Sequence, residues 1–311
     1  MNNVSTAHPA VRIENLSRAF HRKQALDSVS LTIPSGSIFG LVGINGSGKT
    51  TLIRHIIGLL RPLHGTVEVL GESPIAKPES FLQRIGYLTE EDTLPQWMRV
   101  GELLDFSRAV YRAWDQAYAQ ELCEMFGLSR AMRLTSLSKG QRARVGLLVA
   151  IAHRPELLVL DEPSRGLDPL ARSDILEAII RTISQEGRTV LFSSHLLDEV
   201  DRVCDTVALM SEGRIIETLT VEHLETRYHE IVCRPGAAWS PPAQLAGVFG
   251  WRQTGEEWSA VVDASVQAVV PDDFSVFEQR EISLSRWFAA RASLASPVTD
   301  GRADSEVTAD V

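Results

Sequence analysis

Cysteine is scarce in this chain of 311 residues, with three copies at Cys123, Cys204 and Cys233. Three scattered cysteines cannot form a disulfide framework or a cysteine-rich metal site. Their scarcity suits a reducing compartment, because disulfides persist mainly in oxidising ones. We therefore expect the protein to act in the cytoplasm.

Long hydrophobic runs are also missing. The first residues, MNNVSTAHPAVRIENL, have neither the basic start nor the apolar core of a signal peptide. The longest apolar stretch, residues 145–152, is far shorter than the roughly 20 residues that a membrane-spanning helix needs. If the protein works at a membrane, another chain must span it.

Positive charge is in deficit, since 31 Lys and Arg face 40 Asp and Glu and the formal net charge is −9. Binding to nucleic acid requires concentrated positive charge, so we expect no nucleic-acid partner. The apolar fraction of 44% and the charged fraction of 23% are those of an ordinary globular protein.

What the chain does contain is an alternation of strand-like and helix-like segments. The expected strands cover residues 11–34, 38–42, 156–160, 189–193 and 206–210. The expected helices cover residues 50–61, 170–184 and 196–202, with a mostly helical stretch at about 90–136 in which Leu103, Phe106 and Val110 share one face. Such alternation predicts a parallel sheet wrapped by helices.

The character of the sequence changes after about residue 222. Residues 223–311 have no lysine, four of the six tryptophans, and 13 acidic side chains against 7 arginines. Short strand candidates (230–233, 248–252, 258–262) and a helix at 284–292 predict a small α+β domain over 223–295. The polar, acidic residues 296–311 are typical of a disordered tail.

The sequence GINGSGKT at residues 43–50 fits a phosphate-binding P-loop. Glycines let the backbone N–H groups turn around an anion, and the helix that follows adds its positive end. The pattern assigns Lys49 to the β- and γ-phosphates and the Thr50 hydroxyl to Mg²⁺. The expected ATP-binding residues of this loop are Gly43, Ile44, Asn45, Gly46, Ser47, Gly48, Lys49, Thr50 and Thr51.

An apolar strand at residues 157–160 ends in two carboxylates, Asp161 and Glu162. Alone, this pattern is equally typical of an ordinary acidic turn. Downstream of a P-loop it assigns Asp161 to Mg²⁺ and Glu162 to the water that attacks the γ-phosphate.

A third motif, LSKGQ at residues 137–141, precedes a helix-like segment. By itself Ser138 would be read as a helix N-cap. Together with the P-loop and the acidic strand end, this motif resembles the signature of ABC ATPases, and the resemblance runs over about residues 11–220. It implies an α/β P-loop NTPase fold: a RecA-like core, an antiparallel β subdomain and an α-helical subdomain at about 90–140. The first domain would then cover residues 1–222, and the α+β appendage would follow it.

The resemblance also implies roles for further residues. Asp168 would belong to the D-loop, and His195 would sense the γ-phosphate, although a lone histidine is more often structural. In this family two ATPase subunits pair head to tail, so Ser138, Gly140 and Gln141 would act on the partner's ATP. The cofactors implied are ATP and Mg²⁺.

Three residues depart from the family's pattern. Phe20 stands where a tyrosine usually stacks on adenine, and it keeps the aromatic face. Lys139 replaces the first signature glycine. Glu90 replaces the Q-loop glutamine, and its carboxylate is expected to ligate Mg²⁺.

The segment at 86–106, with Tyr111, Trp114 and LSKGQ, looks like bacterial drug, bacteriocin and lipid exporter ATPases. For Trp97, Tyr111 and Trp114 the plainer reading is core packing. The exporter resemblance implies separate permease subunits and a position at the inner face of the membrane. An importer subunit, or a soluble ABC protein acting on ribosomes or chromosomes, remains an alternative.

Overall fold

The computed structural model describes residues 8–89, 91, 93–234, 241, 245–266 and 276–295. The chain divides into two compact units, Met1–Glu225 and Thr226–Val311. The division falls within a short helix, α8 (Val221–Arg227), whereas the sequence placed it after residue 222. Residues 296–311, which we expect to form a tail, lie outside the described residues.

A six-stranded sheet forms the centre of the first unit, and its first five strands are parallel, as predicted. The last strand runs antiparallel to its neighbour. The strand order is β5 (Ile85–Leu88), β6 (Leu157–Asp161), β7 (Thr189–Ser194), β3 (Ile38–Val42), β8 (Thr206–Ser211) and β9 (Arg214–Thr220). Strands β3, β6 and β7 are buried at every position. Their continuous apolar runs are typical of a parallel sheet that is covered on both faces.

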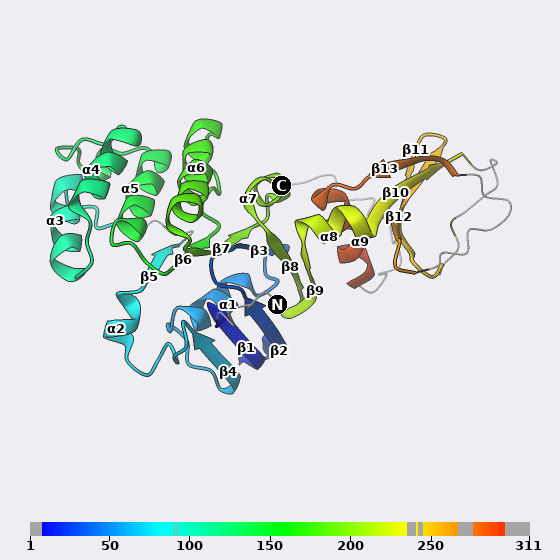
Figure 1. Ribbon diagram of the computed structural model, residues 1–311, viewed down its shortest axis with the longest axis horizontal. Coiled ribbons are helices and arrows are strands. Elements are labelled where there is room, and N and C mark those ends of the chain that lie inside the picture. The colour runs from blue at the N-terminus through cyan, green and yellow to red at the C-terminus, as the bar shows by residue number, and fades with distance from the viewer. Residues whose placement is uncertain are drawn as a thin grey trace, which may run out of the picture. The chain divides into compact units, whose positions relative to one another are not determined.

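Helices cover this sheet and form a separate cluster beside it (Figure 1). The helices of the first unit are α1 (Lys49–Ile56), α2 (Pro78–Leu82), α3 (Val100–Val110), α4 (Gln116–Met125), η1 (Leu134–Ser136), α5 (Lys139–Ile151), α6 (Pro169–Glu186) and α7 (Leu197–Val203). Helices α3 and α4 pack against α5, which packs in turn against α6. Helices α3, α4 and η1 lie within the expected helical subdomain at about 90–140, whereas nearly all of α5 and the whole of α6 lie beyond those bounds.

The expected inner face of α3 is wrong in part. Leu103 is buried, but Phe106 is 58% exposed and Val110 is 47% exposed. The helical period allowed two neighbouring faces, and the buried arc is the one that contains Leu103 and Leu104. Phe106 therefore lies outside the contact with α5.

Core packing is also wrong for Trp97, which is 79% exposed. Tyr111 stacks on the buried His153, with ring centroids 3.9 Å apart. Trp114 is half-buried and donates from Nε1 to Gln116 Oε1 at 3.2 Å. For these three aromatic residues the expectation of core packing therefore has different outcomes.

A three-stranded antiparallel sheet, in the order β2 (Lys23–Ile33), β1 (Val11–Phe20) and β4 (His64–Val69), forms the second sheet of this unit. Val29, Leu31 and Ile33, which alternate along the expected strand at residues 11–34, are buried in the core that includes Leu52 and Ile53 of α1. This sheet therefore packs through α1 onto the central sheet, as expected for the β subdomain.

The described part of the second unit contains a four-stranded antiparallel sheet and a helix that follows it. Its strand order is β11 (Val248–Thr254), β12 (Glu257–Asp263), β10 (Tyr228–Cys233) and β13 (Val276–Glu281), and the helix is α9 (Leu284–Ala295). Trp287 of α9 is fully buried. Gly250 lets α9 approach β11, because a Cβ there would lie 2.3 Å from the Cβ of Ala290. The appendage is α+β, as predicted, but β13 was not predicted.

The three cysteines are free and buried. Among the described residues, no helix combines the length and the apolar character needed to cross a membrane.

Candidate nucleotide-binding site

The P-loop, the acidic strand end and the segment with His195 lie at one edge of the central sheet, because parallel strands end on the same side. Val42 of β3 pairs with Ser194 of β7, and Asp161 of β6 pairs with Ser193 of β7. The P-loop follows β3, Glu162 follows β6 and His195 follows β7. The sheet register thus gathers segments that are far apart in the sequence.

The P-loop conformation depends on glycine at two positions. Gly48 has a φ of +111° and caps α1, and a Cβ there would lie 2.6 Å from the Ala25 carbonyl oxygen. A Cβ at Gly43 would lie 2.3 Å from the Met210 carbonyl oxygen. The N-terminus of α1 faces the loop, so its positive end is available to an anion.

A pocket of about 420 Å³ lies along this loop. The predicted residues that line it are Phe20, Asn45, Gly46, Gly48, Lys49, Thr50, Thr51 and Glu162, and they are joined by Lys23, Ala25 and Arg165. The buried Ser47 hydroxyl has no hydrogen-bond partner among the residues that the structure describes. The sequence analysis did not predict Arg165 as a residue of this pocket, although its position three residues after Glu162 could have indicated it.

Asp161 is almost fully buried and accepts a hydrogen bond from the Ser193 hydroxyl at 2.8 Å. Burial raises the pKa of Asp161 more than the hydrogen bonds from Ser193 and Thr50 lower it. The Thr50 hydroxyl and the Asp161 carboxylate are hard oxygen donors, which are the ligands that Mg²⁺ prefers. The residues present therefore fit a magnesium site.

Glu162 is held between two nitrogen-bearing side chains. Its Oε1 lies 3.2 Å from Lys49 Nζ, and its Oε2 lies 2.5 Å from His195 Nδ1. Lys49 also donates to the Gly43 carbonyl at 2.7 Å. The backbone of Glu162 has a φ of +52°, in the left-handed region that non-glycine residues rarely adopt. Such strain costs about 1–3 kcal/mol and persists where the surrounding contacts enforce it.

The signature residues lie away from the P-loop pocket. Ser138 accepts from the Gln141 N–H at 3.2 Å, and Gln141 Oε1 accepts from the Ser138 N–H at 2.9 Å, which forms a capping box at the start of α5. Gly140 packs beside Asp168, since a Cβ there would lie 3.3 Å from Asp168 Oδ2. Asp168 Oδ1 accepts from the Ala171 N–H at 3.0 Å.

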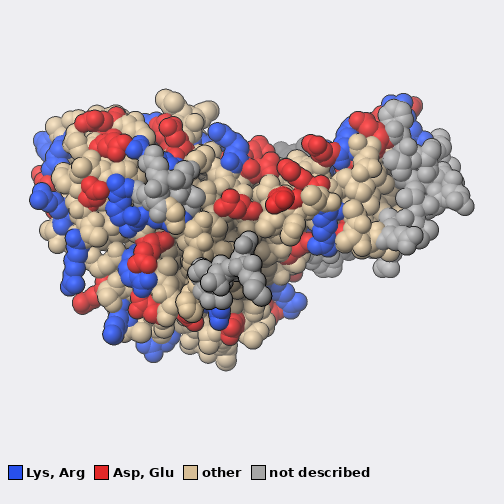
Figure 2. Space-filling view, viewed as in Figure 1, with Lys and Arg blue, Asp and Glu red and all other residues tan. Residues whose placement is uncertain are grey.

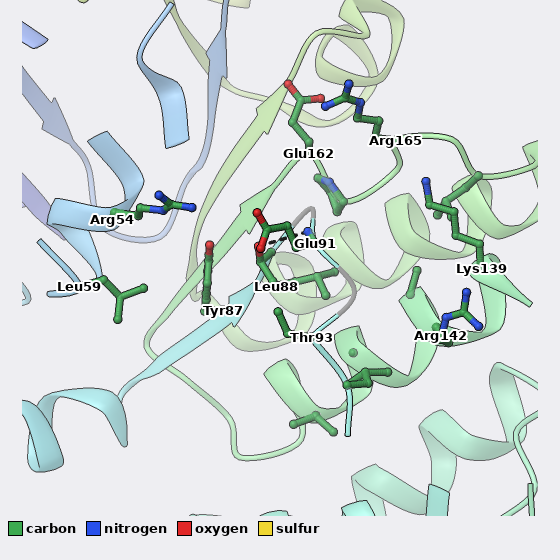
Figure 3. A pocket seen from close by; sticks show the side chains of 17 residues that line it. Arg54, Leu59, Tyr87, Leu88, Glu91, Thr93, Lys139, Arg142, Glu162 and Arg165 are labelled. Atoms are coloured by element: carbon green, nitrogen blue, oxygen red, sulfur yellow. Dashed lines mark hydrogen bonds between the residues drawn. The ribbon is translucent and has the colours of Figure 1, made fainter. Parts of the chain in front are cut away.

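A second pocket, of about 380 Å³, adjoins the first, and Glu162 and Arg165 line both. Figure 3 shows Arg54 and Tyr87 on one side of it and Lys139 and Arg142 of α5 on the other. This pocket places the start of the signature helix across from β5.

The three unusual residues have different outcomes. Phe20 is 40% exposed, lines the P-loop pocket, and has the Arg18 guanidinium 4.8 Å from its ring centroid. The Lys139 ammonium lies over the D-loop, where a Cβ at Gly166 would be 2.6 Å from its Nζ. Glu90 lies outside the described residues, so its part in metal binding stays a prediction.

A P-loop on a mostly parallel sheet, with a buried aspartate at the end of another strand of that sheet, defines a P-loop NTPase. Residues 26–165 match the ABC transporter family model. A solved structure of an ATP-binding subunit of an ABC transporter is 28% identical, with a TM-score of 0.64, over 70% of this chain and 92% of that one.

Three curated relatives agree. An uncharacterized ABC transporter ATP-binding protein of Bacillus subtilis, YdbJ, is 37% identical over 67% of this chain and 68% of its own length. The bacitracin transport ATP-binding protein BcrA of Bacillus licheniformis is 30% identical over 70% of this chain and 72% of its own. The Nod factor export ATP-binding protein I of Sinorhizobium fredii is 35% identical over 68% of this chain and 63% of its own. The chain belongs to the ABC transporter ATP-binding family, whose members bind and hydrolyse ATP.

Proposed function

We propose that this chain is the ATP-hydrolysing subunit of an exporter and that it drives separate membrane-spanning permease subunits from the cytoplasmic side. The observation that carries the proposal is the placement of Glu162 between Lys49 and His195, beside the buried Asp161. The name of one relative, for Nod factor export, favours an exporter over an importer, and the name of another, for bacitracin transport, is consistent with a transporter.

In the proposed mechanism each group acts at a stated place. The backbone amides of residues 43–51 surround the phosphates, Lys49 leaves Glu162 for the γ-phosphate, and Phe20 stacks on the adenine. Thr50 and Asp161 would hold Mg²⁺, with Glu90 as a further ligand, and the ion would neutralise charge on the β- and γ-phosphates. Glu162 then accepts a proton from the attacking water, and His195 contacts the γ-phosphate.

The same proposal includes a dimer. Ser138, Gly140 and Gln141 do not line the P-loop pocket of their own chain, so an ATP bound there lacks the signature unless a second subunit supplies it. Asp168, which packs against Gly140, would lie at the same subunit interface. The partner would be a second ATPase subunit, either identical or related.

The charge distribution gives no support to a nucleic-acid partner. On the face shown in Figure 2, Lys and Arg are interspersed with Asp and Glu over the first unit, without one broad basic surface among the residues drawn as described. We therefore favour transport over the ribosome or chromosome alternative.

The test is reconstitution with any membrane protein whose gene lies next to the gene of this chain. Both proteins are co-expressed, purified together and placed in lipid vesicles, and ATPase activity is compared with that of the ATPase subunit alone. We expect co-purification and stimulated hydrolysis that is lost in Lys49→Ala. Failure of every adjacent membrane protein to bind or stimulate would contradict the transport assignment, and hydrolysis unaffected by Lys49→Ala would contradict the site.

A further inference from the structure

A further buried carboxylate, Glu199, lies near the edge of the sheet that carries Asp161 and Glu162. It is on α7, is 3% exposed, and has no place in the mechanism above. Removing a carboxylate from water destabilises the folded protein unless charged or hydrogen-bonding partners compensate the lost solvation. Its partners therefore indicate why it is there.

Three side chains converge on Glu199. The Ser164 hydroxyl donates to Oε2 at 2.5 Å, and the Ser194 hydroxyl donates to the same oxygen at 3.4 Å. Arg172 Nε lies 3.0 Å from Oε1. Both serines are buried to within 1% of full burial, so water does not compete for their hydroxyls.

These partners come from the segments that carry the catalytic groups. Ser164 is two residues after Glu162, and Ser194 is immediately before His195. Arg172 lies in α6, just after the D-loop residue Asp168. Glu199 Oε2 thus connects the loop that carries Glu162 with the loop that carries His195. The side chains of these two loops meet where His195 Nδ1 lies 2.5 Å from Glu162 Oε2.

The strained backbone of Glu162 needs contacts that hold it in place, and the contacts of Glu199 with Ser164 and Ser194 can supply them. A φ of +52° persists only where neighbouring contacts fix it. On one side the Glu162 N–H donates to Ser193 at 3.1 Å. On the other side, the Arg165 N–H donates to the Glu162 carbonyl at 3.2 Å and the Leu167 N–H donates to the Ser164 carbonyl at 3.1 Å. The Ser164 side chain ties this turn to Glu199. Without the carboxylate, both serine hydroxyls lose a buried acceptor and the turn loses this constraint.

We propose that Glu199 is a positioning residue for ATP hydrolysis, which holds the Glu162 turn and the His195 loop at their working separation through Ser164 and Ser194. Arg172 compensates the charge of Glu199 and connects the Glu199 carboxylate to the start of α6. This inference rests on the proposed roles of Glu162 and His195. It adds a residue that touches neither nucleotide nor metal.

The test compares Glu199→Ala and Glu199→Gln with the wild-type protein. Glu199→Ala should lower kcat by roughly 10- to 100-fold, while the Kd for a fluorescent ATP analogue stays within about threefold, because the P-loop is not touched. Glu199→Gln keeps one oxygen for the serine hydroxyls, so it should retain a clearly larger share of kcat. Asp174→Ala is the matched control: it breaks the 2.6 Å ion pair of α6 with Arg144 and should leave kcat within about twofold.

A second arm separates positioning from simple loss of stability. In a His195→Ala background, adding Glu199→Ala should lower the single-turnover rate much less than it does in the wild-type background. Without the His195 side chain, the distance between the Glu162 turn and the His195 loop no longer affects the rate. If Glu199→Ala does not fold, Ser164→Ala and Ser194→Ala each remove one link and should lower kcat with Kd unchanged.

Wild-type kcat in Glu199→Ala, or equal losses in Glu199→Ala and Asp174→Ala, would overturn the inference. Full additivity with His195→Ala would do the same. Glu162→Gln is the reference for the underlying mechanism. If that variant hydrolyses ATP normally, the proposed function fails; if it is inactive while Glu199→Ala is normal, only the role of Glu199 fails.

Discussion

Phe20 tests the nucleotide end of the site at the scale of a single residue. It is partly exposed and lines the P-loop pocket. Phe20→Ala removes the ring and should weaken ATP binding by roughly 3- to 10-fold, the effect of about 0.5–1.5 kcal/mol of aromatic stacking. Titration with a fluorescent ATP analogue measures this, and Phe20→Tyr is the control that should bind normally. Equal affinity of all three proteins would show that adenine binds elsewhere.

Single residues also mark how far the sequence could predict the site. Lys49, Thr50, Asp161 and Glu162 were predictable because their chemistry depends on local motifs. Glu199 was not, since its burial and its contacts with Ser164 and Ser194 arise only when β6, β7 and α7 are packed. A lone glutamate on an amphipathic helix otherwise resembles a solvated side chain.

At the scale of elements, the second unit depends on an ion pair between α8 and the end of β12. Arg227 donates to both oxygens of Asp263, at 3.1 and 2.8 Å, and Ser265 donates its hydroxyl and its N–H to Oδ1. Burial raises the pKa of Asp263, but these hydrogen bonds outweigh it and lower the pKa from 3.8 to about 2.

This lowered pKa predicts how the stability of the second unit varies with pH. The stabilisation is complete above pH 3.8 and is lost as the pH falls toward 2, because the carboxylate must then be protonated in the folded state. Since Arg227 is 43% exposed, the contribution is about 1–2 kcal/mol.

The measurement is urea unfolding of the full chain followed by tryptophan fluorescence, with Asp263→Asn compared with wild type. At pH 7 the variant should be less stable in the transition of the second unit, and the difference should shrink as the pH approaches 3. Glu278→Gln, which removes the exposed pair with Arg280, is the control and should change nothing measurable. A difference that does not vary with pH would contradict the assignment.

Prediction of the elements succeeded where the sequence pattern allowed one burial pattern. It failed where two faces of a helix were equally apolar. Strands β3, β6 and β7 are buried at every position, and their short, mostly apolar sequences predicted buried strands. On α3 the period of 3.6 could not choose between the arc through Phe106 and the arc through Leu104, because the choice depends on where α5 lies. β13 is assigned by its pairing with β10 and carries no comparable apolar run.

At the scale of the whole molecule, the two compact units predict separable functions. We expect a chain that ends after Glu225 to fold and to bind MgATP with an affinity within about threefold of the full chain, because every described residue of the P-loop pocket lies before residue 226. Circular dichroism checks the fold and calorimetry measures binding. A shortened chain that folds but does not bind nucleotide would contradict this division.

The account as a whole depends on two subunits enclosing ATP between the P-loop of one and the signature of the other. Glu162→Gln should reduce hydrolysis by roughly 10²–10⁴-fold, the usual loss of a general base, while ATP binding is kept. ATP should then accumulate between two subunits. Ser138→Arg in the same background is the matched control, because it blocks the signature and leaves the P-loop pocket unchanged.

The most direct measurement is therefore the mass of Glu162→Gln protein in MgATP, by size-exclusion chromatography with light scattering, together with its bound nucleotide. The account predicts a dimer of 34.3 kDa subunits with two unhydrolysed ATP molecules, which reverts to monomer when Ser138→Arg is added. A monomer in saturating MgATP, or a dimer that Ser138→Arg does not affect, would contradict the composite site. ADP in place of ATP would contradict the role of Glu162.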